Sequence, residues 1–388
     1  MPLFRPPAIA SCEIDAIDLL RYKGEWVVRA RSRDGAVGIA ATTSRLEYIH
    51  PLLTQRVAPF FIGKDARDLP QLIDDAYRKW SNYKLAGLPF WSAVAWVELA
   101  VLDLLGRVAN QPVHAFFGEQ RHPRIPVYLS VLDRESSPEQ IADRLSQALD
   151  ESGALAVKVK IGGRMSRNAD ASPGRSERLL TVLRTRLPAN VALCVDANGS
   201  YDVPTAIEVG HMLESLGVVL FEEPCPFDRY DDTRQVADRL TIPIAGGEQD
   251  SSVARWEQIF RDHVVDVAQP DVLYNGGLIR TAHVVEMARA AGREIALHNP
   301  HVGPSAVYGM HLAAVMNNPW PFHELNVKHI TESAIATLVL PVHQGTVTLP
   351  PGAGFGLEID ERALARAEVK ERIRRRARRT LGRWLAPW

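Results

Sequence analysis

Five ionisable residues recur along the chain at nearly constant spacing, and nearly every one of them ends a short apolar run. They are Asp196, Glu222, Glu248, Asp271 and His298. Each step between neighbours is close to the length of one strand–helix repeat. In parallel (β/α) barrels, side chains at the carboxyl ends of successive strands converge on one region, where the active site lies. The spacing therefore predicts one active site to which consecutive barrel strands each contribute a residue.

Three of these residues are carboxylates at the ends of neighbouring runs, and they predict a metal site. Asp196 lies in Cys-Val-Asp-Ala-Asn, Glu222 in Phe-Glu-Glu-Pro and Glu248 in Gly-Gly-Glu-Gln. Three carboxylates at one point repel each other unless a divalent cation neutralises them, and Mg²⁺ prefers such hard oxygen ligands. Any one of them alone would equally suit a helix N-cap or a loop charge. We expect one Mg²⁺ per subunit, with Glu223 on the opposite face of its strand.

A pair of lysines predicts general-base chemistry. Lys158 and Lys160 end another β-rich run, and period-two alternation puts both on the same face of the strand. Two ammonium groups side by side near a cation lower each other's pKa, which makes a lysine a usable base near neutral pH. At a strand edge the same pair would be two solvated charges. On an inward-facing barrel strand we expect them to take part in the reaction.

Asp271 and His298 end consecutive runs, so we expect them to be lateral neighbours. A carboxylate beside an imidazole fixes its tautomer and raises its basicity. His301 competes for this position, but His298 directly follows the apolar run Ile295-Ala296-Leu297 and is preferred. Glu324, at the end of the last run, completes the ring. It is either an acid held protonated, which donates a hydrogen bond to a developing enolate, or part of a salt bridge at the barrel rim.

The elements that must position these residues are short β-rich runs that alternate with helical patterns from about residue 126. The intervening segments carry helical periodicity, with Ala206, Val209, Leu213 and Leu216 on one face as an example. Such alternation implies parallel pairing with right-handed crossovers, and hence an α/β fold with a TIM-type barrel. Eight runs are present, the number that a closed barrel requires: 127–131, 154–161, 191–195, 218–221, 243–246, 264–268, 294–297 and 321–325.

The part before the barrel reads as α+β. Two β-rich runs, 25–33 and 36–42, flank Asp34-Gly35, which is a strong hairpin signal. A helix is expected over 92–108, with Ser92 as its N-cap. Beyond residue 340 the sequence predicts a strand within 345–349, then a glycine-rich turn and a basic helix. We expect this tail to pack back on the N-terminal part.

Composition argues against several classes of function. The 388 residues carry a formal net charge of −1, so no global field attracts nucleic acid or an anionic membrane. The most apolar stretch, 85–97, is too short to span a bilayer, and the N-terminus shows no signal-peptide pattern. We expect a cytoplasmic protein with no membrane or nucleic-acid partner. The three cysteines are too few and too widely spaced for a disulfide framework, which fits a reducing compartment: Cys12, Cys194 and Cys225.

Two other functions compete with a metal enzyme of this kind. Paired acids such as Glu222 and Glu248 also serve glycosidases, but a glycosidase needs neither a third acid nor two lysines. The run 372–383 is strongly basic, and basic tracts can bind nucleic acid. The near-neutral total charge and the lack of a helix-turn-helix or finger pattern favour a solvated helix face for this run.

At these residues the sequence resembles the enolase superfamily, in particular its mandelate racemase-like subgroup. The resemblance extends over nearly the whole chain, including Gln111-Pro112-Val113 to Gly118 and the stretch Pro-Gly-Ala-Gly-Phe-Gly-Leu-Glu-Ile-Asp that ends at Asp360. It implies a modified (β/α)₈ barrel over 126–340. It also implies an α+β capping domain formed by 1–125 together with the tail 341–388.

The resemblance also implies roles for the site residues. It makes Lys160 the base of a Lys-x-Lys motif, Lys158 the lysine near the substrate carboxylate, and Asn198 a polar neighbour. The muconate-lactonising subgroup has a lysine where this chain has Asp271, so a lysine here faces a histidine. The other matches are Asp196, Glu222 and Glu248 as Mg²⁺ ligands, Asp271 with His298 as a dyad, and Glu324 as the acid on the last strand. The segment from His298 to His301 holds two histidines and departs from the commoner arrangement.

The implied chemistry is removal of the proton α to a carboxylate, which gives an enediolate. If His298 then protonates a departing β-hydroxyl, the enzyme is a lyase, an acid-sugar dehydratase of carbohydrate catabolism that makes a 2-keto-3-deoxy acid. If His298 instead reprotonates the enediolate, the enzyme is a racemase or epimerase. Dehydratases are the more numerous in the subgroup and are favoured. We also expect a homo-oligomer, with substrate choice set by capping loops around 42–50, which include Arg45 and Tyr48.

Overall fold

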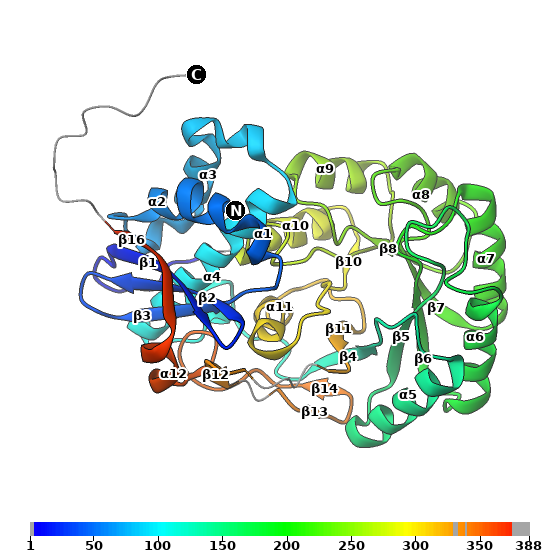
Figure 1. Cartoon of the computed structure of the whole chain (residues 1–388). Helices are drawn as coiled ribbons and strands as arrows, with labels where there is room; N and C mark the ends of the chain where they lie inside the picture. The colour runs from blue at the N-terminus through cyan, green and yellow to red at the C-terminus, as the bar shows by residue number, and fades with distance from the viewer. Residues whose placement is uncertain (1–3, 329–332, 338–339, 375–388) are drawn as a thin grey trace.

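Eight parallel strands and their connecting helices make up the larger part of the computed structural model, which describes residues 4–328, 333–337 and 340–374 (Figure 1). The hydrogen-bonded order is β10-β9-β8-β7-β6-β5-β4, and β11 pairs with β4 on its other side. Each predicted run overlaps one strand, so the predicted barrel architecture is confirmed. The strands are β4 (Ile125–Ser130), β5 (Ala156–Lys160), β6 (Ala192–Asp196), β7 (Val218–Glu222), β8 (Ile244–Gly246), β9 (Val267–Ala268), β10 (Glu294–Ile295) and β11 (His323–Asn326).

The ring of strands is closed between β10 and β11 by a backbone bridge at Ile295, which bonds to Asn318 and Trp320, and by side chains beyond it. Nδ1 of His323 accepts a hydrogen bond from the backbone N–H of Leu297 at 3.2 Å, and Glu324 Oε2 accepts one from Asn299 N–H at 3.0 Å. β10 spans only two residues. Backbone donors beyond its end therefore need other acceptors, because a buried N–H without a partner is costly. The seam thus brings Glu324 into the barrel mouth.

Helices cover the outside of the barrel and enter it through well-defined caps. Ser137 accepts a hydrogen bond from Gln140 N–H, and the Gln140 side chain accepts one from Ser137 N–H, which is a complete capping box for α5. Leu278, Ala282, Val285 and Ala288 are buried on one face of α10, as their spacing predicts. The helices are α5 (Pro138–Ser152), α6 (Arg175–Arg186), α7 (Val203–Ser215), α8 (Tyr230–Ala237), α9 (Val253–Arg261), α10 (Leu278–Ala290) and α11 (Val307–Ala313).

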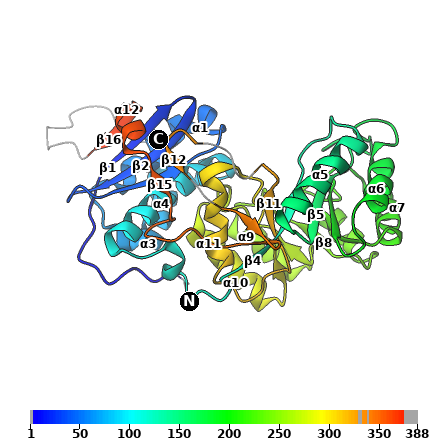
Figure 2. The same cartoon turned by 90° about the horizontal axis from the view of Figure 1, so that it is seen from below.

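The N-terminal part is an antiparallel sheet backed by helices, and it lies beside the barrel (Figure 2). The sheet order is β16-β1-β2-β3, and the Asp34-Gly35 turn joins β2 to β3 as predicted, with Gly35 at φ +88°. α4 packs against β2 and β3. The elements are β1 (Ile14–Tyr22), β2 (Glu25–Ser32), β3 (Val37–Ala41), α1 (Leu46–Leu52), α2 (Ala58–Phe61), α3 (Leu69–Arg78) and α4 (Leu88–Ala109).

Helix α4 corrects two predictions. It begins at Leu88, so Ser92 is not its N-cap but a buried residue inside it, because Pro89 is tolerated in the first turn. By length and composition α4 would be able to cross a membrane, so the argument that this stretch is too short is wrong. In the fold, 89% of its most apolar window is buried. Its Glu98 carboxylate accepts hydrogen bonds from the first N–H groups of α10, at Leu278 (2.9 Å) and Ile279 (2.8 Å).

The C-terminal segment contacts both parts of the molecule. β16 (Glu368–Arg374) pairs antiparallel with β1 and lies beside it in Figure 1. Residues 372–374 therefore form a strand edge, and the prediction of a basic helix is wrong there; 375–383 lie outside the described residues. The β13–β14 hairpin pairs with β4, and β15 pairs with β12. The bounds are β12 (Ala336–Thr337), β13 (Val342–His343), β14 (Thr346–Val347), β15 (Glu358–Ile359) and α12 (Glu361–Arg366).

Candidate active site

Strand alternation explains why the ionisable residues point inward. A layer of apolar side chains fills the barrel. Because side chains alternate in direction along a strand, the residue two positions after each member of this layer also points inward. Asp196, Glu222 and His298 occupy such positions, and they therefore stand directly above this layer. The layer has one residue from each strand or its immediate flank: Tyr128, Ala156, Cys194, Leu220, Ala245, Val267, Ala296 and Trp320.

Asp196, Glu222 and Glu248 converge, as their spacing predicted. One carboxylate oxygen from each lies within 4.8 Å of the others. Asp196 and Glu222 are fully buried, and the Glu248 side chain is 13% exposed. Among the described residues, Glu222 Oε1 has no hydrogen-bond partner, and burial together with Asp196 raises the pKa of Glu222 to about 7. Such uncompensated negative charge on hard oxygens fits a divalent cation such as Mg²⁺.

A fourth carboxylate joins this group. The prediction that Glu223 points to the opposite face is wrong, because β7 ends at Glu222 and Glu223 adopts φ +43°, which ends the alternation. Its Oε2 lies 3.4 Å from Asn198 Nδ2, and Asn198 also donates from its backbone N–H to Asp196 Oδ1 at 2.7 Å. Burial and the nearby Glu248 raise the pKa of Glu223 well above its usual value.

Both lysines of the β5 strand lie inside the barrel, each against a carboxylate. Lys160 Nζ pairs with Asp196 Oδ2, and Lys158 Nζ lies 2.6 Å from Glu222 Oε2 and 3.0 Å from Glu324 Oε1. Burial lowers the pKa of Lys158, but Glu222 and Glu324 more than offset it and raise the pKa well above the usual value. At Lys158 the carboxylates outweigh the second ammonium group, whereas the predicted lowering of the pKa supposes a cation that neutralises these carboxylates.

Glu324 pairs with Lys158 in this arrangement. Although burial raises its pKa, the charges of Lys158 and His298 bring the pKa down to about 2. Of the two alternatives drawn from the sequence, the salt bridge is the one observed, and it lies inside the barrel rather than at the rim.

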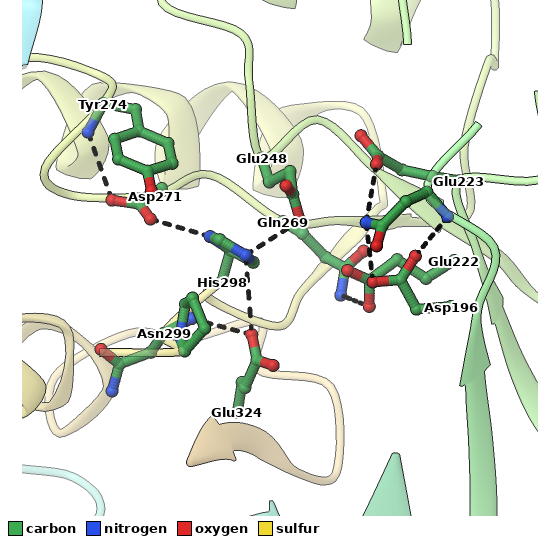
Figure 3. A network of polar contacts seen from close by, with 12 residues as sticks. Asp196, Glu222, Glu223, Glu248, Gln269, Asp271, Tyr274, His298, Asn299 and Glu324 are labelled. Atoms are coloured by element: carbon green, nitrogen blue, oxygen red, sulfur yellow. Dashed lines mark hydrogen bonds and ion pairs between the residues drawn. The ribbon is translucent and has the colours of Figure 1, made fainter. Parts of the chain in front are cut away.

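His298 is held between carboxylates on both sides of its ring (Figure 3). Its Nδ1 lies 2.8 Å from Asp271 Oδ2, and its Nε2 lies 2.9 Å from Glu248 Oε2. His301 Nε2 is 3.0 Å from the same Asp271 oxygen. Burial lowers the pKa of His298, but Glu248 and Asp271 raise it well above the usual value. Both histidines therefore contact Asp271, and His298 is the one of the two that also reaches the carboxylate cluster.

Sequence reasoning missed three polar residues near the centre. Gln269 donates from Nε2 to Glu222 Oε2 at 2.8 Å, and strand alternation from Val267 was a signal that could have found it. Arg134 donates from Nη2 to Asn198 Oδ1 at 3.1 Å. The ring centroids of Tyr274 and His298 lie 6.1 Å apart, and the guanidinium of another residue lies over the Tyr274 ring.

That guanidinium belongs to Arg45, one of the two capping-loop residues expected to influence substrate choice. Arg45 Cζ lies 4.6 Å from the Tyr274 ring centroid, and its Nη1 contacts the Tyr274 hydroxyl. Tyr48, the other one, is 84% exposed. The loop thus contributes one residue at the edge of the site and one that faces solvent.

The fold and the site together define a barrel with an acidic centre that a buried lysine and a buried histidine contact. Residues 140–363 match the family model described as enolase C-terminal domain-like, and residues 23–118 match that of the mandelate racemase/muconate lactonizing enzyme N-terminal domain. The chain belongs to the enolase superfamily. This membership leaves the glycosidase alternative without support.

Known relatives share the fold over most of their length. Arabinonate dehydratase of Saccharolobus solfataricus is 28% identical over 331 residues, which cover 84% of this chain and 86% of the relative. More distant relatives include an L-talarate/galactarate dehydratase and chloromuconate cycloisomerases. A racemase candidate from Roseobacter denitrificans has a solved structure that is 33% identical, with a TM-score of 0.85 over 92% of this chain and 98% of that one.

A second solved structure was determined with a metal. It is a mandelate racemase/muconate lactonizing protein from Paracoccus denitrificans complexed with magnesium, 26% identical, with a TM-score of 0.82 over 92% of this chain and 99% of that one. The relatives thus include dehydratases, cycloisomerases and racemases. The chain is an enzyme with enolase-superfamily chemistry.

Proposed function

We propose that the protein is a Mg²⁺-dependent lyase that removes water from a sugar acid and releases a 2-keto-3-deoxy acid. The observation that carries this proposal is the placement of two bases on one carboxylate cluster: Lys160 contacts Asp196, and His298 contacts Glu248. The two side chains come from β5 and from the segment after β10, so they approach the cluster from different sides of the ring. The similarity to arabinonate dehydratase supports a sugar acid as the substrate.

The proposed ligands of the cation are Asp196, Glu222 and Glu248, the three residues whose oxygens converge. When bound there, Mg²⁺ would supply positive charge to the substrate carboxylate and to the enediolate, and such electrostatic stabilisation usually contributes most to the rate. Asn198 and Gln269 hold two of the ligands in place, because they donate to Asp196 and Glu222.

The residues of the chain then divide the proton transfers between them. Lys158 lies beside Glu222, where it binds the substrate carboxylate. Lys160 takes the α-proton, and the electron pair of that C–H bond forms the enediolate. The C–O bond at the β-carbon breaks as His298 Nε2 gives its proton to the leaving hydroxyl, which departs as water. The resulting enol becomes the 2-keto-3-deoxy acid, and Asp271 steadies the imidazole through Nδ1.

Racemisation or epimerisation is the second candidate. His298 Nε2 and Lys160 Nζ contact carboxylates of the same cluster from different sides, which is also what a two-base exchange at one carbon requires. In that case His298 returns a proton to the α-carbon on the face opposite Lys160. The similarity to the racemase candidate from Roseobacter denitrificans supports racemisation or epimerisation as the second candidate.

A substrate screen tests both candidates. The Mg²⁺-loaded enzyme is incubated in D₂O with a library of mono- and diacid sugars, and the products are read for a 2-keto acid and for deuterium at C2. A 2-keto product supports dehydration, whereas deuterium in recovered substrate supports racemisation or epimerisation. Absence of both across the library, with metal bound, would contradict the proposed function.

Three further expectations belong to this proposal. The domain division at 125/126 and 340/341, a homo-oligomeric assembly and a cytoplasmic location all remain predictions. Analytical ultracentrifugation measures the assembly state directly. Limited proteolysis followed by mass spectrometry locates the boundaries, because linkers between compact units are cut first.

A further inference from the structure

The side chain of Arg280, at the start of α10, joins two loops that carry site residues. Its Nε donates to the carbonyl of Asn275 at 2.7 Å, and its Nη2 donates to the carbonyl of Ser251 at 2.6 Å. Ser251 lies three residues after Glu248, and Asn275 lies four residues after Asp271. These are the two carboxylates that contact opposite nitrogens of the catalytic imidazole. One guanidinium therefore connects the loop behind each of them.

The guanidinium is fixed in place by aromatic rings from the N-terminal part. Arg280 Cζ lies 3.4 Å from the ring centroid of Trp91 in α4, and Trp91 stacks on Tyr77 of α3 with centroids 5.3 Å apart. Gly276 leaves room for this stack: a Cβ there would lie 2.6 Å from Arg280 and 2.8 Å from Trp91. Among the described residues no carboxylate forms an ion pair with Arg280. Its interactions are thus the two carbonyls and the ring face.

The clamp on His298 depends on the separation of these loops. Glu248 Oε2 is 2.9 Å from Nε2, and Asp271 Oδ2 is 2.8 Å from Nδ1. The imidazole can make both contacts only while the distance between the Glu248 and Asp271 carboxylates stays the same. A displacement of about 1 Å at a reacting group costs on the order of a hundredfold in rate. Whatever fixes the loops relative to each other therefore affects proton transfer at His298.

We propose that Arg280 is a positioning residue for His298. By bridging the Ser251 and Asn275 carbonyls, it sets the separation of Glu248 and Asp271 and hence the orientation of the imidazole. The stack on Trp91 and Tyr77 makes this separation depend on the docking of the N-terminal part. The kinetic part of this inference rests on the proposed function, whereas the structural part does not.

The location of Arg280 makes a rescue experiment practicable. Arg280 and Trp91 line an open groove of about 1110 Å³ between α3 and helices α9 and α10, away from the carboxylate cluster. In Arg280→Ala, methylguanidinium from solution can enter this groove and occupy the place of the side chain. Arg289→Ala is the matched control, because Arg289 lies on the same helix and lines the same groove but pairs with Glu286 at 3.0 Å instead of bridging the two loops.

The first measurement needs no substrate. The imidazole ¹⁵N–¹H signals of histidine-labelled protein are recorded, and those of His298 are assigned by their loss in His298→Asn. We expect the His298 signals to shift in Arg280→Ala, to return with methylguanidinium but not with an equal concentration of methylammonium, and to stay unchanged in Arg289→Ala. Unchanged His298 signals in folded Arg280→Ala would overturn the inference.

The second measurement compares the step that depends on His298 with α-proton removal by Lys160. The His298 step is formation of the 2-keto acid for an acid that is dehydrated, or exchange on the His298 face for an acid that is racemised. Arg280→Ala should lower this step by about tenfold to a hundredfold relative to α-proton exchange by Lys160, and methylguanidinium should restore it. An equal loss in both steps would indicate a merely structural role and would refute the proposal. If Arg280→Ala does not fold, the imidazole signals of His298 are measured in Arg280→Lys instead. A lysine ammonium group lacks the planar guanidinium geometry by which Arg280 donates to both carbonyls. If the wild-type enzyme neither dehydrates nor exchanges any acid, the proposed function fails while the imidazole signals still decide the role of Arg280.

Discussion

At the scale of single residues, the centre of the barrel holds more acids than bases. Lys160 and Lys158 are the two lysines that face the carboxylates, and each already pairs with at least one. This excess of negative charge favours a bound cation, which would free the lysines to contact a substrate instead of the carboxylates of the site. The acids are Asp196, Glu222, Glu223, Glu248, Asp271 and Glu324.

Metal binding should therefore stabilise the folded enzyme. We expect Mg²⁺ to raise the melting temperature of metal-free protein, with a gain of about 2.7 kcal/mol at a hundred times the dissociation constant. EDTA should reverse the shift and abolish activity. Differential scanning calorimetry measures the effect. Glu222→Gln is expected to lose most of the Mg²⁺-dependent shift, and a full shift in that variant would argue against Glu222 as a ligand.

The two proposed bases should fail on different faces of the substrate. For an acid that is racemised or epimerised, Lys160→Ala should lose α-proton exchange from one stereoisomer, and His298→Asn should lose it from the other, each by roughly 10²–10⁴-fold because a positioned base contributes that much. For an acid that is dehydrated, Lys160→Ala should lose α-proton removal, whereas His298→Asn should lose formation of the 2-keto acid and keep exchange by Lys160. Exchange in D₂O followed by NMR measures both. Loss of the same stereoisomer in both variants would show that the two groups do not act on opposite faces.

His301 provides the control for this assignment. It contacts Asp271 at 3.0 Å, whereas His298 contacts Asp271 and also reaches Glu248 in the carboxylate cluster. We expect His301→Asn to lower the rate by less than about tenfold, since it only loosens the Asp271 partner of the dyad. A loss as deep as that of His298→Asn would transfer the catalytic role to His301.

At the scale of elements, the seam between β10 and β11 depends on a neutral histidine. Burial lowers the pKa of His323 to about 3, and its Nδ1 must stay unprotonated to accept from Leu297 N–H. The unfolded pKa is about 6.5, so between these values the unfolded state binds more protons. This stability is complete above the unfolded pKa and is lost as pH falls towards 3, by about 2 kcal/mol at pH 5.

His323→Asn separates titration from hydrogen bonding. The Asn amide oxygen takes the place of Nδ1 and can accept from Leu297, yet it does not titrate. We expect urea denaturation to show a smaller loss of stability from pH 7 to pH 5 in this variant than in the wild type. The flattening is partial, because burial also lowers the pKa of His311 to about 3. An unchanged pH dependence would rule out His323 as a contributor.

The close contact between α4 and α10 also predicts an effect at Gly277. Gly277 has φ +101°, and a Cβ there would lie 2.0 Å from Glu98 Oε2, which accepts the first N–H groups of α10. Gly277→Ala should therefore cost at least about 1–3 kcal/mol in unfolding free energy from backbone strain alone. Gly292→Ala is a matched control, because Gly292 has φ +68° but no atom within 4 Å of its Cβ position. Equal losses of unfolding free energy in both variants would show that the contact with Glu98 adds nothing to the cost of the Gly277→Ala substitution.

Much of the barrel was predictable because its strands recur once per strand–helix repeat and because side chains alternate in direction along each strand. Buried apolar runs mark the strands, and the next inward position after each run carries the chemistry, which is why the sequence predicts Asp196 and Glu222. The same rule reaches Gln269, which stands two residues after Val267. It works because alternation is a local property of extended backbone.

The residues that escaped prediction depend on local backbone breaks or on contacts between distant segments. Glu223 turns into the site through a positive φ that no periodicity predicts. Arg134 comes from a loop, and its position follows from packing between parts of the chain far apart in sequence. The prediction for Ser92 fails because a proline in the first turn is compatible with an earlier helix start.

At the scale of the whole molecule, a buried carboxylate ties the two ends of the described chain together. Asp18 on β1 accepts from Arg29 Nη2 at 2.6 Å and from Arg372 Nε on β16 at 2.8 Å, and Arg31 Nη2 lies 3.4 Å away. Asp18 is fully buried, so its removal leaves several guanidinium groups without a counter-charge.

Asp18→Ala should therefore destabilise the protein by roughly 3–5 kcal/mol, as expected when one partner of a buried ion pair is removed. Arg33→Ala is the control, because Arg33 pairs with Glu13 at 3.3 Å while its own side chain is 71% exposed. Exposed pairs contribute about 0–1 kcal/mol. Urea denaturation measures both, and a loss below about 1 kcal/mol for Asp18→Ala would count against its role in joining β1 to β16.

The pairing of β16 with β1 also sets an order of events during synthesis. All eight barrel strands have been synthesised once Asn326 is made, whereas the strand that covers the outer edge of β1 begins only at Glu368. Domains generally fold in the order in which they leave the ribosome, and an uncovered strand edge can pair with other chains. The edge of β1 therefore stays uncovered until after the barrel strands have been made, and the nascent chain carries a complete set of barrel strands before the sheet that contains β1 acquires β16.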